Sequence, residues 1–464
     1  MKQKYSLLKA GGLMLSALLP WSAYAQTYDF KMCVEDALHK NPEMDVSSSR
    51  IQQAESALQQ AEASRYPQLN LSITGTNSDN PLNVFGMKLQ QRQAAFADFG
   101  VDGGAMTELN NGNFSYEPRG LNYPDAHTDF NTRIEMLIPI WNGGRIKSYE
   151  DQAAAMIDAA QQGDAAVQQY LTYNVYQAYE AVHAARSYIK VAEQAKKTAD
   201  SFVKTTRNLV EQGVVVRSEL LSAEVHQSAA EVALMKAQGQ EQIALDSLRM
   251  LMNMDASAEL DVAERMDLQL PQDSVDGLLA LAMSGNPELE AKRREATSSG
   301  FAINAARADK YPHFNVMLRQ DWNSETPGFD SSSYTVAGVV SWKITDFGVT
   351  AGAIDMANAS AEQKKAAVRS AENKVRLDLL TAWRKMQIAQ KQVQSNELAV
   401  QQAEEALELV MRRYENGVST MTEVLGAQTQ LDKARADLVS ANYDVNVFKA
   451  KLRLASGTMD IKLL

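Results

Sequence analysis

The stretch that decides the fold is RRYENGVSTMTEVLGA, residues 412–427, and RNLVEQGVVVRSELLSA at residues 207–223 is its earlier copy. In each, a helical pattern without proline runs into Glu-x-Gly-Val and restarts at an acidic residue followed by two aliphatic residues. Glycine enters the left-handed conformation just past a helix end without steric cost. Gly213 and Gly417 therefore predict two helical hairpin tips, near residues 211–218 and 415–422.

The residues after each glycine predict how the returning helices start. Ser218 and Thr422 are hydroxyl residues at the expected first position, so they are predicted to cap these helices. Glu219 and Glu423 then fall in the first turn, where a negative charge is favourable.

The whole chain is duplicated. Asn41-Pro42-Glu43 matches Asn286-Pro287-Glu288 at an offset of 245, whereas the tip glycines match at an offset of 417 − 213 = 204. The first half therefore carries 245 − 204 = 41 extra residues, all between Pro67 and Ile140. A repeat this long indicates a duplicated module rather than a solenoid unit. We expect a first repeat over residues 26–270 and a second over residues 271–464.

An export signal precedes the repeats. Lys2, Lys4 and Lys9 lead into an apolar run that ends near Trp21, and Ala-Tyr-Ala follows, which predicts a signal peptide at residues 1–25 and cleavage before Gln26. Removing three Lys takes the net charge from −11 to 43 − 57 = −14, which argues against nucleic-acid partners.

Strict alternation of apolar and polar residues predicts four strands, one pair in each repeat. The first pair is expected at about residues 67–75 and 129–139, and the second at about 312–322 and 334–342. The residues expected on the apolar face include Leu69, Leu71, Ile73, Phe314, Val316 and Leu318; the opposite face carries Asn70, Asn131, Arg133, Glu135, Asn315, Arg319 and Asp321. The 41 extra residues lie between the first two strands, where we expect an elaborated exposed loop with a helical middle.

Long helices follow each strand pair. Apolar residues recur at spacings of three and four from Val375 to Tyr414, and the copy runs from Leu171 to Val210. This is a coiled-coil seam rich in alanine, on helices of about 67 residues, or roughly 100 Å each. A helix of that length needs partners along it, and four strands need other chains to close their edges.

The signal peptide, the paired Asn-Pro-Glu and Tyr-Pro junctions, the strand pairs and the twin tips together resemble the TolC-type outer-membrane efflux proteins. The resemblance covers essentially the whole mature chain. It implies a mainly α fold with β structure: a homotrimer with a twelve-stranded transmembrane β-barrel, four strands per chain, and a long α-helical barrel in the periplasm. It also implies a passive exit duct of a tripartite efflux or type I secretion system, fed by an inner-membrane pump through a periplasmic adaptor.

The resemblance also implies roles for tip residues. The adaptor-docking residues are expected at the two tips and just behind them: Gly213, Val214, Leu220, Leu221, Gly417, Val418, Val424 and Leu425. Glu423 is expected to gate the channel as a ring of three carboxylates that attracts cations. Alternatively, Glu423 only stabilises its own helix through the dipole. Gly426 stands where the family pattern has a second acid, so a weaker cation site is expected.

No enzyme constellation accompanies these features. The five histidines show no pair at metal-ligand spacing, and we find no phosphate-binding loop or nucleophile elbow, so neither an enzyme nor a cofactor is expected. Cys33 is the one cysteine and is expected to be an idle thiol. An exported trimeric coiled-coil fibre or adhesin remains the alternative, although it would not need hairpin tips.

Overall fold

The computed structural model describes residues 27–463, and the predicted export signal with its cleavage point before Gln26 lies outside this range. Two compact units share the chain. The first, here called the tip unit, comprises the residues up to 41, 171–268 and 386–450; the second, the sheet unit, comprises residues 42–170, 269–385 and 451 onward. Both repeats of the sequence contribute to both units.

The helices of the two repeats come in pairs of equal length. α1 (Phe30–Lys40) and α8 (Val275–Gly285) have 11 residues, α2 (Pro42–Ala63) and α9 (Pro287–Ala308) have 22, α6 (Arg145–Glu211) and α10 (Val349–Glu415) have 67, and α7 (Arg217–Leu251) and α11 (Met421–Ala455) have 35. The predicted class, mainly α with β, is confirmed.

The paired Asn-Pro-Glu junctions make the same contact in both repeats. Asn41 Nδ2 donates to the carbonyl of Leu251, the last residue of α7, over 2.8 Å. Asn286 Nδ2 donates to the carbonyl of Ala455, the last residue of α11, over 3.0 Å. The carbonyls at a helix end have no partner within the helix, so each asparagine satisfies one of them.

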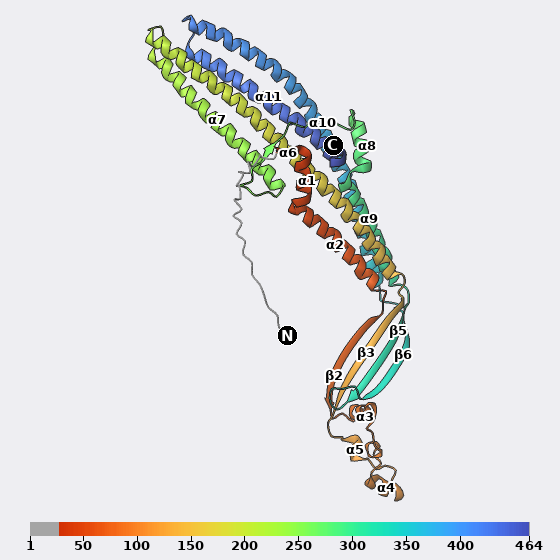
Figure 1. Ribbon diagram of the computed structural model, residues 1–464. Helices are drawn as coiled ribbons and strands as arrows, with labels where there is room; N and C mark the ends of the chain where they lie inside the picture. The colour runs from red at the N-terminus through yellow and green to blue at the C-terminus, as the bar shows by residue number, and fades with distance from the viewer. Residues whose placement is uncertain (1–26, 464) are drawn as a thin grey trace, which may run out of the picture. The chain divides into compact units, whose positions relative to one another are not determined.

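The sheet unit contains four antiparallel strands in the order β2-β3-β5-β6 (Figure 1). They are β2 (Gln68–Ser78), β3 (His127–Trp141), β5 (His313–Ser324) and β6 (Ser331–Ser341). Within the chain, β2 and β6 are therefore the two edges, and each leaves one row of backbone groups without a strand partner.

The register separates an apolar from a polar face. Leu71 pairs with Ile134, and Val316 pairs with Ile138, so apolar residues share one side of the sheet. On the other side, Arg133 binds Asp321 over 2.7 Å, and in the same way Arg319 binds Glu135 over 2.6 Å. The charges of the polar face are thus paired across β3 and β5.

The 41 extra residues fold between β2 and β3. They form α3 (Pro81–Gln90), a 3₁₀ turn at Phe96–Phe99, α4 (Gly103–Asn110) and α5 (Arg119–Asn122). In Figure 1 these elements lie at the end of the strands away from α2 and α9. We call the whole segment between β2 and β3, residues 79–126, the insert; it contains the 41 extra residues.

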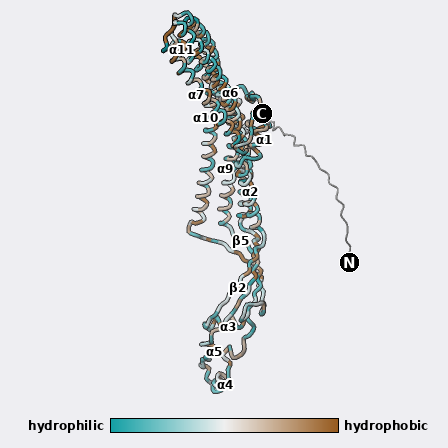
Figure 2. The backbone as a smooth tube through the Cα atoms, turned by 60° about the vertical axis from the view of Figure 1, so that its left-hand side comes forward, coloured by the Kyte–Doolittle hydropathy of each residue, from teal (hydrophilic) through white to brown (hydrophobic). Residues whose placement is uncertain are grey.

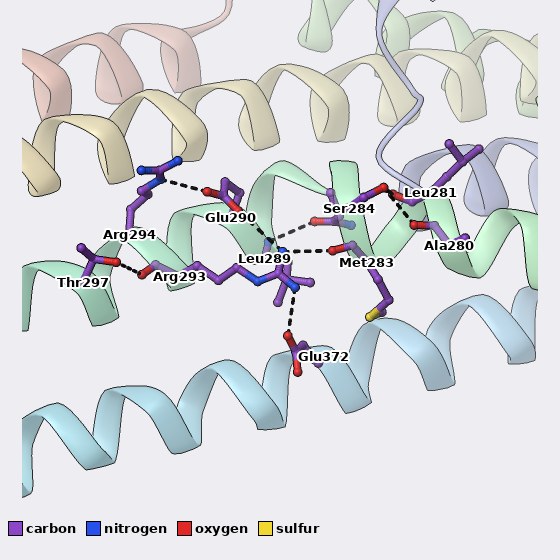
Figure 3. Close-up of polar contacts among 11 residues, drawn as sticks. Ala280, Leu281, Met283, Ser284, Leu289, Glu290, Arg293, Arg294, Thr297 and Glu372 are labelled. Carbon is purple, nitrogen blue, oxygen red and sulfur yellow. Dashed lines mark hydrogen bonds and ion pairs between the residues drawn. The ribbon is translucent and has the colours of Figure 1, made fainter.

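Arg293 on helix α9 forms hydrogen bonds to both neighbouring helices, as Figure 3 shows. Arg293 donates to the carbonyl of Met283 on α8 over 3.0 Å and to Glu372 on α10 over 2.9 Å. Because an arginine presents its donors in a fixed plane, these two contacts set the position of three helices together.

The tip unit is built from the adjacent parts of α6, α7, α10 and α11. The predicted seam is confirmed in each unit: Met386 of α10 and Val175 and Val182 of α6 are buried in the tip unit, and Leu379 and Ala382 of α10 are buried in the sheet unit. Figure 2 shows hydrophobic and hydrophilic residues interspersed along these helices, as expected for stripes of apolar residues on otherwise polar helices.

A short two-stranded sheet forms within the tip unit. β1 (Thr27–Tyr28) pairs in parallel with β4 (Asp261–Val262), and Arg265 binds the fully buried Glu180 over 3.1 Å. Burial raises the pKa of the Glu180 carboxyl, and the Asn446 amide and Arg265 oppose this shift. Both donors reach Oε2, whereas Oε1 is buried without a hydrogen-bond partner in the described part of the chain, so the carboxyl group is only partly satisfied.

Candidate functional site: the two helical tips

The first tip turns on a left-handed glycine. Gly213 has φ of 69°, and the N–H of Val214 donates to the carbonyl of Leu209 over 2.9 Å, which closes the end of α6. A Cβ built on Gly213 would meet nothing within 4 Å. The backbone conformation, rather than crowding, therefore requires glycine here.

The second tip repeats this geometry. Gly417 has φ of 73°, the N–H of Val418 donates to the carbonyl of Arg413 over 2.9 Å, and a Cβ on the glycine would again be free of contacts. The left-handed turns predicted at both glycines are confirmed.

The predicted caps are wrong by two residues. Val216 precedes α7 and forms no side-chain cap, while Ser218 lies inside the helix. At the second tip Thr420 precedes α11, and its Oγ accepts from the N–H of Glu423 over 3.3 Å; Thr422 lies inside the helix. Each returning helix therefore starts two residues earlier than predicted.

The start of α11 is capped from the other tip. The Glu219 carboxylate accepts from the backbone N–H of Met421 over 2.7 Å, across 202 residues of sequence. This N–H has no acceptor within its own helix. The contact joins the two tips, and local rules for reading a sequence do not reveal it.

A small apolar core lies behind this contact. Its buried members come from α6, α7, α10 and α11: Phe202, Val203, Ala223, Tyr414, Met421 and Val424. The Tyr414 hydroxyl donates to Thr206 Oγ over 3.2 Å, and burial raises the pKa of this tyrosine. The two hairpins therefore hold each other through packing and two polar contacts.

The residues expected to dock an adaptor divide into three groups. Val214, Leu221 and Val418 are more than half exposed, at 52%, 52% and 67%. Leu220 and Leu425 are half-buried against the core, and Val424 is a buried member of it. Val424 therefore shapes the tip from inside, while the first group faces outward.

Glu423 is exposed in the first turn of α11. Its carboxylate accepts from the Ser419 hydroxyl over 2.5 Å. Gly426 is also exposed. The carboxylate is therefore held in place by its own tip and stays accessible.

Residues 27–463 contain no cluster of three or more His, Cys, Asp or Glu side chains that could hold a metal ion. Cys33 is a buried free thiol, and burial with the nearby Asp29 and Asp36 raises its pKa to about 12. Within the same described range, none of the helices has the length and apolarity needed to cross a membrane.

Known outer membrane proteins resemble this chain in sequence or in structure. The chain is 23% identical over 340 residues to the outer membrane efflux protein BepC of Brucella suis, covering 72% of this chain and 74% of BepC. It is 22% identical over 361 residues to the pyoverdine export outer membrane protein OpmQ of Pseudomonas putida, covering 76% of each. The crystal structure of CusC superposes with a TM-score of 0.76 at 18% identity, over 98% of this chain and 96% of CusC.

The family model for outer membrane efflux proteins matches residues 33–254 and 278–458. These two ranges correspond to the two repeats and include both tips and all four strands of the sheet. The protein therefore belongs to the outer membrane efflux protein family.

Proposed function

We propose that three copies of this chain form a passive exit duct in the outer membrane, fed by an inner-membrane pump through a periplasmic adaptor. The sheet has open edges at β2 and β6. Unpaired backbone groups are not tolerated in lipid, so β6 of one copy would pair with β2 of the next to close a twelve-stranded barrel. Membership of an efflux family favours this duct over the fibre or adhesin considered from the sequence.

The observation that carries the proposal is a second apolar stripe on α7. One side of this helix is buried within the tip unit through Ala223, Ala230 and Leu248. The opposite side exposes a stripe with spacings that are typical of one helix face: Leu221, Val225, Val232, Met235, Ile243 and Met250, each 50–72% exposed. A helix with two opposite apolar stripes is suited to lie between two neighbours, as in a closed ring of helices.

Charged substitutions on this stripe of α7 test whether the chain assembles into the proposed trimer. Val225→Glu and Met235→Glu each place a carboxylate where a neighbouring copy would pack, and both should reduce the trimer seen on an unheated detergent gel. Gln238→Glu adds the same charge on another exposed face of α7 and should leave the trimer intact. If all three variants assemble like the parent, α7 does not contact a second copy through this stripe.

The tips are proposed to dock the adaptor. Gly213 and Gly417 fix the turns, and the exposed Val214, Leu221 and Val418 offer apolar contacts beside them. Leu220, Val424 and Leu425 support this surface from behind. Val214→Glu with Val418→Glu should abolish co-purification of the adaptor while the trimer persists. Normal adaptor recovery in that variant would exclude the tips as the docking surface.

Glu423 is proposed as the gate residue. Threefold assembly would bring three copies of this exposed carboxylate near the channel axis, where they would repel one another and attract cations. A ring of this kind selects for cations more naturally than it stabilises a fold.

A further inference from the structure

The insert places one helix across the full width of the sheet. Helix α3 begins at Pro81, directly after the edge strand β2, and Asn80 caps it by accepting from the N–H of Leu82 over 3.0 Å. At its far end, the carbonyl of Gln91 accepts from Ser331 Oγ over 2.6 Å, at the start of β6. Since β6 is the opposite edge, α3 connects the two edges of the sheet.

The length of α3 agrees with the width of the four-stranded sheet. Helix α3 has 10 residues. At a rise of 1.5 Å per residue this gives a length of about 15 Å. The outermost of four strands spaced about 4.8 Å apart are separated by about 14 Å. A helix of this length is therefore long enough to span the four strand ends that one chain supplies.

Helix α3 approaches the sheet from its polar side. Val84, Met87 and Gln91 recur at the spacing of one helix face, and all three are buried. Gln91 Nε2 donates to Asp129 Oδ1 over 2.8 Å, and Asn323 Nδ2 donates to Asp129 Oδ2 over 2.9 Å.

Asp129 identifies this side. It alternates in phase with Arg133 and Glu135 on β3, and its partner Asn323 is in phase with Asp321 on β5. Arg133, Glu135 and Asp321 belong to the ion pairs across β3 and β5, so α3 contacts the polar face of the sheet.

The far end of α3 is fixed rather than loosely attached. Gln91 Oε1 lies 2.7 Å from His127 Nε2, so both ends of this amide are bound. Arg92 adopts a left-handed conformation with φ of 58°, and its guanidinium donates to the carbonyl of Ser332 over 2.7 Å. Non-glycine residues rarely adopt this conformation, and they keep it only where the surroundings enforce it.

We infer that the insert is a size filter at the outer mouth of the duct, in which the α3 helices of the assembled copies narrow the opening and set the largest solute that passes. This inference rests on the proposed trimer, in which the polar face lines the channel. Twelve tilted strands enclose a ring about 24 Å across, and a helix is about 10 Å thick. Three such helices on the inner side leave only a small part of the opening free.

The test uses the purified full-length channel in planar bilayers, with polyethylene glycols of graded size as probes. Replacing residues 81–124 by a short glycine-serine linker should raise the single-channel conductance several-fold and admit larger polymers. Gln91→Ala, which removes the anchor on Asp129, should give a smaller rise in conductance. Gln90→Ala alters the neighbouring exposed glutamine and should behave like the parent.

The inference is overturned if the linker variant forms trimers whose conductance and polymer limit match the parent. If that variant does not assemble, the Gln91 and Gln90 pair decides, and equal conductance in the two overturns the inference. Failure of the proposed duct looks different, because the parent itself would then form no trimer and conduct no current.

Discussion

Replacement of Glu219 by Ala tests the contact that joins the two tips. The variant removes the acceptor that lies 2.7 Å from the N–H of Met421. Met421 is fully buried, so water cannot take the place of the lost carboxylate without local opening. A hydrogen bond to a charged group contributes about 1.5–3 kcal/mol, and about 1.4 kcal/mol corresponds to a tenfold change in an equilibrium.

The opening equilibrium of the second tip should therefore shift by roughly ten- to a hundredfold. Hydrogen exchange of the assembled protein, followed by mass spectrometry, measures this shift as faster exchange at the start of α11. Glu219→Gln keeps a neutral oxygen acceptor and should show a smaller acceleration. Glu211→Ala removes an exposed carboxylate from the same tip and should leave the exchange unchanged.

A capping role for Glu219 is refuted if peptides covering residues 417–424 exchange equally fast in Glu219→Ala and in the parent. It is also refuted if Glu211→Ala accelerates the exchange to the same degree, because a general loss of negative charge at the tip would then be responsible.

Three further changes address the membrane face, the turn and the gate. Val316→Arg should destabilise the membrane-inserted trimer by about 2–4 kcal/mol and reduce the amount of trimer recovered, whereas Asn315→Arg should change trimer recovery little. Equal losses of trimer in the two variants would show that the apolar face does not contact lipid. Gly417→Val forces a β-branched residue into the left-handed region, which destabilises the turn by about 1–3 kcal/mol. The variant should still form trimers on the gel, but efflux of a dye from cells should be impaired. Glu423→Gln should reduce cation selectivity in planar bilayers without changing trimer stability, and unchanged selectivity would remove Glu423 from the gate.

Local periodicity predicted those parts of the fold that local physics determines. The spacing of Leu379, Ala382 and Met386 is that of a buried helix face, and the three residues are buried. The alternation at Leu69 and Leu71 is that of a half-apolar strand, and both residues lie in β2. Each inference needs only the geometry of one element and the solvent on one side of it.

Contacts that join distant parts of the chain could not be read in this way. Gln91 looks like any polar residue at the end of a short helix, yet its partners are 38 and 240 residues away. The signal that could have drawn attention to it is its spacing from Val84 and Met87, which places an amide on an otherwise apolar helix face. An amide in such a position must find partners, because burying it without them costs free energy.

Two acids at equivalent positions of the two tips have different contacts. Glu219 and Glu423 occupy matching positions after Gly213 and Gly417. Glu219 crosses to the other tip and binds Met421, whereas Glu423 accepts from Ser419 within its own tip and remains exposed. The N–H of Glu423 is satisfied by Thr420. The N–H groups of Met421 and Glu423 are thus satisfied without the Glu423 carboxylate, which leaves the helix dipole as its remaining interaction with α11. At an exposed site the dipole interaction contributes only about 0.3–1 kcal/mol, so Glu423→Gln should change trimer stability little whether or not it changes cation selectivity, and the selectivity measurement decides whether Glu423 is a gate residue.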